Sequence, residues 1–221
     1  MKLPFDTSQF FAVFASYNTA IWPAQIVLTA LGIAAVALAL RPRPWSDRAV
    51  AGVLAVLWVW MGLVYHVAFF STINPAANVF GALFVLEGIA LAALGVGRRL
   101  RFRFDTDVRG VAGAAFIVYA LVLYPVLGYV AGHRYPATPT FGAPCPTTIL
   151  TLGLLLWAEA PKLLLIVPLA WSLLGASAAA QLGVWEDLGL VAAGLLAAVL
   201  TLAPRSSATK NTSLTTSDLT S

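Results

Sequence analysis

Charged side chains are scarce in this 221-residue chain: they make up 10% of the sequence, whereas hydrophobic residues make up 60%. An average soluble domain carries about 25% charged residues. With so few charges, the chain cannot cover the surface of a soluble globule of this size. The composition therefore predicts an all-α membrane protein, with room for roughly six or seven spans of ~20 residues and none for a second folded domain.

Cysteine and histidine are nearly absent as well. Cys145 is the one cysteine in the sequence, so an intramolecular disulfide is excluded. The best candidates for metal ligands are Cys145, His133, His66 and Glu87, but these residues lack close spacing and match no metal-binding motif. We therefore expect no metal and no other cofactor.

Long apolar stretches fill most of the chain. A helix of about 20 residues crosses the ~30 Å hydrocarbon layer of a bilayer. The turn signal Asn74-Pro75 separates two of the stretches. The stretch 147–182 is too long for one crossing, and we divide it into two at 159–162. The sequence thus predicts seven transmembrane helices, over 21–40, 49–73, 76–96, 110–131, the two parts of 147–182, and 185–202.

The two ends of the chain differ from these spans. Residues 7–19 place large apolar side chains on overlapping helical faces, which is typical of a short amphipathic helix at the membrane interface, with Thr7 or Ser8 as its cap. Residues 205–221 contain ten Ser or Thr residues and no aromatic residue, so they cannot form a core. We expect a transmembrane domain over 1–204 and a disordered cytoplasmic tail over 205–221.

Basic residues are distributed unevenly between the two sides of the predicted bundle. Loops 41–48, 97–109 and 159–162, together with the tail, contain 11 of the 13 Lys and Arg residues, and the other side has Lys2 and Arg134. Because cytoplasmic loops are enriched in Lys and Arg, this asymmetry predicts an N-terminus outside and a cytoplasmic C-terminus. The basic clusters flank apolar runs and lack base-reading groups, so we expect a lipid bilayer as partner and no nucleic acid.

Two ionisable side chains fall inside predicted spans. Glu87 lies about 11 residues into the third span, near the bilayer midplane, where a carboxyl group is costly unless it is protonated, paired or in contact with water. His66 lies about seven residues from the outer end of the second span. The depths differ by about one helical turn, so contact between the two is possible. Each is either a proton-coupling or ligand-binding group, or a packing residue bonded to a neighbouring helix.

The outer loop between the fourth and fifth predicted spans is unusually stiff. Residues 132–146 contain four prolines and two glycines, and they include His133, Arg134 and Cys145. A polar connector rarely has this composition, so we expect a folded cap over the bundle.

The fifth predicted span is short. From Pro146 to Ala158 it has 13 residues, about 20 Å of helix, so its N-terminus with Thr147 and Thr148 would start below the outer surface. A helix N-terminus carries partial positive charge, and His133 and Arg134 would add to it. We therefore expect an outward-facing pocket for a small polar or anionic solute, with the loop as roof and Glu87 as floor. A tilted short helix in a thinned bilayer is the alternative.

Polar residues also gather at the outer level of the other spans, whereas the inner halves are almost purely apolar. This asymmetry favours an extracytoplasmic site over a continuous pore. The residues are Asn18, Gln25, Asn74, Asn78, Ser177, Gln181, Glu186 and Asp187.

Three motifs carry a resemblance to a known family: GHRYPATPTFGAPCPTTI at 132–149, WPAQ at 22–25 and INPAA at 73–77. With them, nearly all of residues 3–203 resembles a family of small bacterial polytopic membrane proteins known only as a domain of unknown function. The resemblance implies a bacterial inner membrane but supplies no activity and no site residues.

Three functions remain open. The first is an outward-facing pocket that binds or transports a small polar or anionic solute. The second is a membrane-embedded enzyme with a His, Glu and Cys site, and the third is an accessory subunit of a membrane complex. The sequence makes no prediction about the oligomeric state. The candidate site residues are Glu87, His66, His133, Arg134, Cys145, Thr147 and Thr148.

Overall fold

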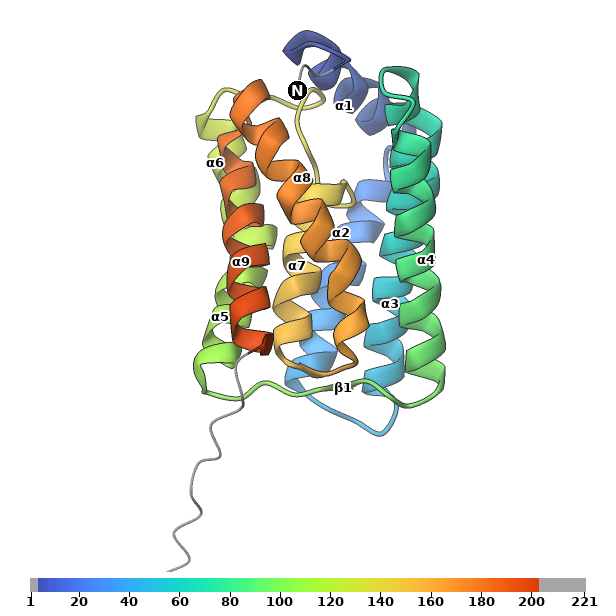
Figure 1. Ribbon diagram of the computed structural model, residues 1–221, viewed down its shortest axis with the longest axis vertical. Coiled ribbons are helices and arrows are strands. Elements are labelled where there is room, and N and C mark those ends of the chain that lie inside the picture. The colour runs from blue at the N-terminus through green and yellow to red at the C-terminus, as the bar shows by residue number, and fades with distance from the viewer. Residues whose placement is uncertain (1–3, 203–221) are drawn as a thin grey trace, which may run out of the picture.

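The computed structural model describes residues 4–202, except for the side chains of residues 176–179. Most helices run along one axis, and α1 lies across one end of the bundle (Figure 1). The predicted tail over 205–221 lies outside the described residues. The helices are α1 Thr7–Ile21, α2 Ala24–Leu40, α3 Ser46–Trp60, η1 Met61–Phe69, η2 Phe70–Thr72, α4 Ala77–Val96, α5 Val108–Val118, η3 Tyr119–Leu123, α6 Tyr124–Val130, α7 Pro144–Leu156, η4 Lys162–Leu165, α8 Ile166–Leu182, η5 Trp185–Asp187 and α9 Leu188–Leu202, and the strands are β1 Arg101–Phe102 and β2 Ala158–Glu159.

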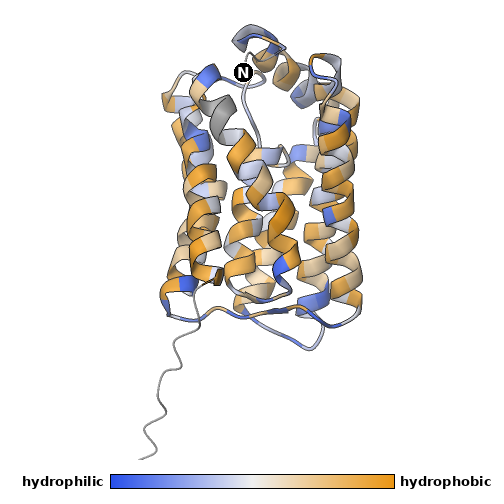
Figure 2. Ribbon diagram, in the orientation of Figure 1, coloured by the Kyte–Doolittle hydropathy of each residue, from blue (hydrophilic) through white to orange (hydrophobic). Residues whose placement is uncertain are grey.

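Five continuous helices among the described residues are long and apolar enough to cross a membrane. Their outer faces expose large aliphatic side chains; on α4, for example, Val79 is 62% exposed and Leu86 59%. Figure 2 shows apolar colour along the helices and polar colour concentrated at the two ends. These features indicate a multi-pass membrane protein. The five helices are Ser46–Thr72, Ala77–Val96, Val108–Val130, Lys162–Leu182 and Trp185–Leu202, close to the predicted ranges.

The predicted number of seven spans is not confirmed. α2 reaches spanning length only together with α1, from which it is bent by 89°, so this pair gives at most a sixth span in the described part of the chain. α7 has 13 residues, and ~1.5 Å of rise per residue is too little to cross ~30 Å of hydrocarbon. The predicted orientation places 132–146 on the outer side and 159–162 on the cytoplasmic side, with α7 between them. Because α7 is too short to cross the hydrocarbon, this orientation requires α7 to start inside the bundle.

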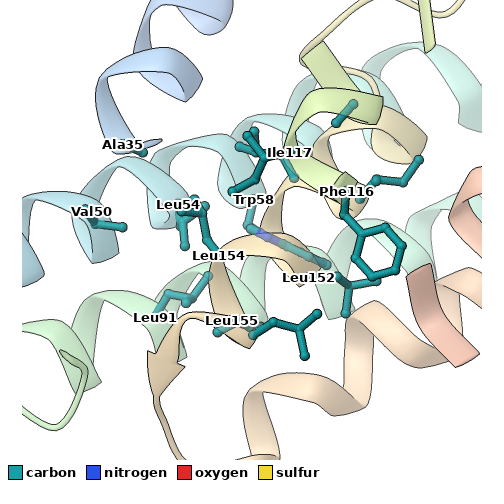
Figure 3. Close-up of a cluster of buried hydrophobic side chains, with 14 of the residues drawn as sticks. Ala35, Val50, Leu54, Trp58, Leu91, Phe116, Ile117, Leu152, Leu154 and Leu155 are labelled. Atoms are coloured by element: carbon teal, nitrogen blue, oxygen red, sulfur yellow. The ribbon is translucent and has the colours of Figure 1, made fainter. Parts of the chain in front are cut away.

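α7 forms the centre of the bundle. All 13 of its residues are buried, and other helices surround it (Figure 1). Leu152 and Leu154 of α7 belong to one apolar cluster with Trp58 of α3 and Phe116 of α5 (Figure 3). A helix that is apolar on every face is typical of a position enclosed by protein. α7 is therefore held by side-chain packing instead of by lipid.

Glycines allow neighbouring helices to approach closely. A Cβ atom at Gly113 of α5 would lie 2.6 Å from the carbonyl oxygen of Gly153 in α7. A Cβ atom at Gly62 would lie 2.7 Å from the carbonyl oxygen of Gly81 in α4. Small residues at such contacts let helix backbones pack without a side chain between them, which is how membrane helices commonly associate. These contacts fix the relative positions of α5 with α7 and of η1 with α4.

A two-stranded ribbon closes the basic end of the bundle. β1 pairs antiparallel with β2, and Arg101 lies opposite Glu159. Asp47 at the start of α3 accepts a hydrogen bond from the backbone N–H of Phe102 at 2.9 Å and forms a salt bridge with Arg103 at 2.8 Å. The ribbon therefore ties the loop with five arginines to the ends of α3 and α7.

α1 begins with a capping box at the opposite end. The Asp6 carboxylate accepts a hydrogen bond from the Gln9 backbone N–H, and the Gln9 side chain accepts one from the Asp6 N–H. The cap is therefore Asp6, and the prediction of Thr7 or Ser8 was wrong. Hydrogen bonds from the Ser8 hydroxyl and the Gln9 N–H lower the pKa of Asp6 because they stabilise its carboxylate.

Candidate functional site

A cavity of about 120 Å³ lies beneath α1, enclosed by α1, η1, α4, α7 and α8. Its base is formed by Pro144 and Cys145 at the start of α7 and by Asp187 of η5. The cavity therefore combines a mostly apolar wall with one carboxyl group, that of Asp187, and one amide group, that of Asn74. Most of the wall is aromatic: Phe5, Phe10, Phe14, Tyr65, Phe70, Phe80 and Trp171.

A π-helical segment positions part of this wall. The helix that starts as α3 widens into a π-helix at η1, Met61–Phe69, and such turns occur frequently at functional sites. The Tyr65 ring stacks on Phe70 at 5.7 Å between centroids and lies 5.3 Å from the Phe14 ring of α1. These contacts connect the second predicted span to the helix that covers the cavity.

Asp187 is the acidic residue of the cavity. It is 2% exposed, and its Oδ1 accepts a hydrogen bond from the Tyr124 hydroxyl at 2.6 Å. Cys145 lines the same cavity as this carboxyl group. The ion pairs within residues 4–202 are Arg103–Asp47 and His133–Glu186. Asp187 is thus a buried carboxyl group without a basic partner among the described residues, which is costly unless it binds a proton or a cation.

Glu186, the preceding residue, has a different partner. Its Oε1 lies 2.7 Å from Nδ1 of His133, and the His133 ring packs 4.5 Å from the ring of Phe11 in α1. The Tyr119 hydroxyl donates to the Glu186 carbonyl oxygen at 2.7 Å. The second carboxyl oxygen of Glu186 is buried with no hydrogen-bond partner in the described part of the chain. The η5 turn therefore brings two buried acids to the same end of the bundle.

The proline-rich loop is folded, but it packs against α1 and does not form the predicted roof of this cavity. Asn18 donates from Nδ2 to the carbonyl oxygens of Pro136 and Thr138, both at 2.7 Å, and its Oδ1 accepts from the Thr140 hydroxyl at 2.7 Å. Gln25 donates to the Asn18 carbonyl oxygen at 2.9 Å. One buried amide thus holds three residues of the loop and the start of α2.

The start of α7 offers little to an anion. Pro144 and Pro146 are the first and third residues of the helix, so two of its first three N–H donors are missing. The Thr147 hydroxyl accepts a hydrogen bond from the Gly142 N–H at 3.0 Å. Thr148 is fully buried, and its hydroxyl has no partner in residues 4–202. Neither threonine lines the cavity. The hydrogen-bonding groups at this helix end therefore serve the local fold and are not directed to a ligand in the cavity.

Arg134 lies away from the cavity. It is exposed, it donates to the carbonyl oxygen of Tyr129, and its guanidinium carbon lies 3.5 Å above the centre of the Tyr129 ring. His133 is engaged with Glu186. His133 and Pro146 at the start of α7 do line a second cavity of about 300 Å³ together with the proline-rich loop, but Arg134 is not part of its lining, so the three predicted groups do not form one positive site.

Glu87 and His66 are both buried but lie at different depths. A Cβ atom at Gly88 would meet Val59, whereas one at Gly81 would meet His66. This register separates Glu87 from His66 by roughly two helical turns, about 10 Å. They form no ion pair with each other in the described residues, and Glu87 does not line the cavity, so the predicted Glu87 floor is not found there. Glu87 Oε1 and both ring nitrogens of His66 lack hydrogen-bond partners in residues 4–202.

Little in the sequence marks Asp187 as a site residue. Two acids at the start of an apolar helix are favourable neighbours of the helix dipole, so their pattern has an ordinary structural explanation. The aromatic wall comes from segments that are far apart in the chain, between Phe5 and Trp171. The available signal was a pair of acids on the outer side of a bundle with almost no other charge there.

Comparison with known proteins gives one match. The chain matches the Family of unknown function (DUF6064) over residues 7–212, in agreement with the resemblance carried by the WPAQ, INPAA and proline-loop motifs. No curated protein and no solved structure matches the chain. The match covers most of the sequence, and the protein therefore belongs to the DUF6064 family.

Proposed function

We propose that this membrane protein binds a small solute in the aromatic cavity beneath α1, on the outer side of a bacterial inner membrane, and acts in its transport. The observation that carries the proposal is the cavity of about 120 Å³ with Asp187 at its base. Binding sites are typically apolar concave surfaces with a few polar groups that orient the ligand. A buried carboxyl group without a basic partner is such a group.

The distribution of basic residues supports an outward-facing cavity. Arg103 of the ribbon pairs with Asp47 at the end of the bundle where most arginines gather, and the cavity lies beneath α1 at the other end. Because Lys and Arg are enriched in cytoplasmic loops, the cavity end is the outer one.

We expect a reporter fused after residue 204 to be active in the cytoplasm. An alkaline phosphatase fused there should be inactive and a green fluorescent protein fluorescent, because the basic loops precede that end of the chain. The same pair of reporters fused within the outer loop, after Ala137, is the control and should give the opposite pattern. A phosphatase that is active after residue 204 would place the cavity on the cytoplasmic side.

Buried polar groups below the cavity support transport in addition to binding. Glu87 is 3% exposed and lies in the middle of the 20-residue helix α4, and its Oε1 has no hydrogen-bond partner within the described residues. Ionisable groups at such positions in membrane proteins commonly serve substrate or proton movement. We therefore assign Glu87 a proton-carrying role in this proposal, separate from the ligand cavity.

The contacts of Cys145 do not favour the enzyme alternative. A catalytic cysteine needs a stabilised thiolate, usually next to a histidine or another positive group. Cys145 instead lines a cavity with the Asp187 carboxyl group and with no Lys, Arg or His from the described residues, and His133 pairs with Glu186.

A binding experiment tests the proposal. Purified protein in phosphatidylcholine nanodiscs is titrated with tetramethylammonium, tert-butanol and pivalate, which share a compact branched shape and differ in charge. We expect at least one of them to raise the midpoint of thermal unfolding by roughly 5 °C at a concentration 100 times its dissociation constant. Failure of all three to bind would contradict the proposed function.

A matched pair of variants locates the binding. Cys145→Leu adds side-chain volume at the base of the cavity and should abolish the rise in unfolding midpoint. Cys145→Ala removes the thiol but leaves the space open, so it should retain binding. Equal responses of the two variants would show that the probe binds elsewhere.

A further inference from the structure

We infer that the solute bound in this cavity is a small organic cation, a protonated or quaternary amine. The inference rests on the proposed function, since it names the class of ligand for the same cavity. It depends on the charge of the base, the chemistry of the wall and the size of the space.

The charge of the base favours a cation. Asp187 lines the cavity, is 2% exposed and accepts a hydrogen bond from Tyr124. Glu186, 1% exposed, precedes it in the chain but pairs with His133, so the charge argument rests on Asp187. Among the described residues, the lining of the cavity contains no Lys, Arg or His. A cationic ligand would supply the counter-charge that the described residues do not give to Asp187.

The aromatic wall favours the same class. Phe14 of α1, Tyr65 and Phe70 of the helix after α3, and Trp171 of α8 face the cavity from different sides. A cation within ~6 Å of the centre of an aromatic ring is attracted by the negative face of that ring, and quaternary ammonium groups are commonly bound in aromatic cages. The aromatic rings of the wall and the Asp187 carboxyl group at the base therefore favour a cation in the same cavity.

The structure also argues against the anion that the sequence suggested. The anionic ligand was expected from the α7 N-terminus with His133 and Arg134. Pro144 and Pro146 remove two of the N–H donors there, and Arg134 lies over Tyr129. An anion in the cavity would meet Asp187 without an opposing positive charge.

The size of the space limits the ligand to a few heavy atoms. The cavity volume is about 120 Å³, and an engineered protein cavity of ~150 Å³ binds benzene. Tetramethylammonium, with five heavy atoms, is within this limit. Tert-butanol has almost the same shape without the charge, so the two probes separate charge recognition from the filling of an apolar space.

Dissociation constants for the three probes test the inference on the unmodified protein. Calorimetric titration at constant ionic strength, in nanodiscs of zwitterionic phosphatidylcholine, avoids attraction of the cation to anionic lipid. We expect tetramethylammonium to bind at least tenfold more tightly than tert-butanol and pivalate. Binding of tert-butanol or pivalate with equal or higher affinity would overturn the cation inference and leave the proposed function standing. Binding of none would overturn both.

Two variants connect the preference to the residues. Asp187→Asn keeps the size of the side chain and should reduce the preference for tetramethylammonium over tert-butanol to about threefold or less, and Asp105→Asn at the exposed basic end is the matched control. Phe80→Leu removes one ring of the wall and should weaken the binding of tetramethylammonium but not that of tert-butanol or pivalate. This test does not depend on the stability of the Asp187 variant. A preference unchanged in both variants would overturn the inference.

Discussion

Replacing Gly113 with leucine is expected to destabilise the bundle by about 3 kcal/mol. A Cβ atom at this position would lie 2.6 Å from both the Gly153 carbonyl oxygen and the Trp157 indole nitrogen. That nitrogen donates to the Gly110 carbonyl oxygen at 2.8 Å, so it cannot move aside without losing its hydrogen bond. Overpacking a core typically costs about 1–3 kcal/mol, and a backbone contact on the central helix places this change at the upper end. Size-exclusion profiles and thermal unfolding in detergent measure the loss.

Gly52→Leu is the matched control for this prediction. No atom lies within 4 Å of a Cβ atom built at Gly52, and leucine favours helix over glycine by almost 1 kcal/mol. The control should therefore be as stable as the original protein or slightly more stable. If Gly113→Leu unfolded at the same temperature as Gly52→Leu, the close packing of α5 on α7 would be wrong.

The positions of the long helices could be predicted from the sequence because they depend on local hydrophobicity. The expected span 76–96 corresponds to α4, Ala77–Val96, and the expected span 185–202 to Trp185–Leu202. Such stretches have few alternatives to a spanning helix, since charged residues are costly in the hydrocarbon and backbone groups there must bond within the helix. The number of spans could not be predicted, because a buried helix such as α7 is as apolar as a membrane-crossing one.

The site could be predicted only in outline. Residues 132–143 form a folded loop against α1, as the prolines and glycines favour, but none of them lines the cavity, and Cys145 lies in α7. Glu87 was selected since a mid-span acid is conspicuous in any sequence. Asp187 accepts a hydrogen bond from Tyr124, which lies 63 positions away in the chain. Such a contact follows from the packing of the helices, so no local sequence pattern predicts it.

Replacing Asn18 with leucine is expected to release the proline-rich loop and to destabilise the protein by about 3 kcal/mol. The side chain is fully buried and donates to the carbonyl oxygens of Pro136 and Thr138 while it accepts from Thr140. Removing one partner of a buried hydrogen bond leaves the other unsatisfied, at about 1–3 kcal/mol for each group. Leucine has the same number of side-chain heavy atoms as asparagine, branched at the same carbon, and adds no partner. Thermal unfolding measures the stability, and amide hydrogen exchange over 132–143 measures the release of the loop.

Asn78→Leu separates the loss of the asparagine from the effect of leucine itself. Asn78 is exposed, and its side chain makes one bond of 3.3 Å to the Pro75 carbonyl oxygen, so this change should leave both the unfolding temperature and the exchange over 132–143 unchanged.

The Asn18 variant should also lose affinity for any cavity ligand, because the loop ends at Gly142, whose carbonyl oxygen accepts from Tyr17 and whose N–H donates to Thr147 at the start of α7. A variant with a freely exchanging loop and full affinity would show that α7 and Cys145 are positioned without the loop.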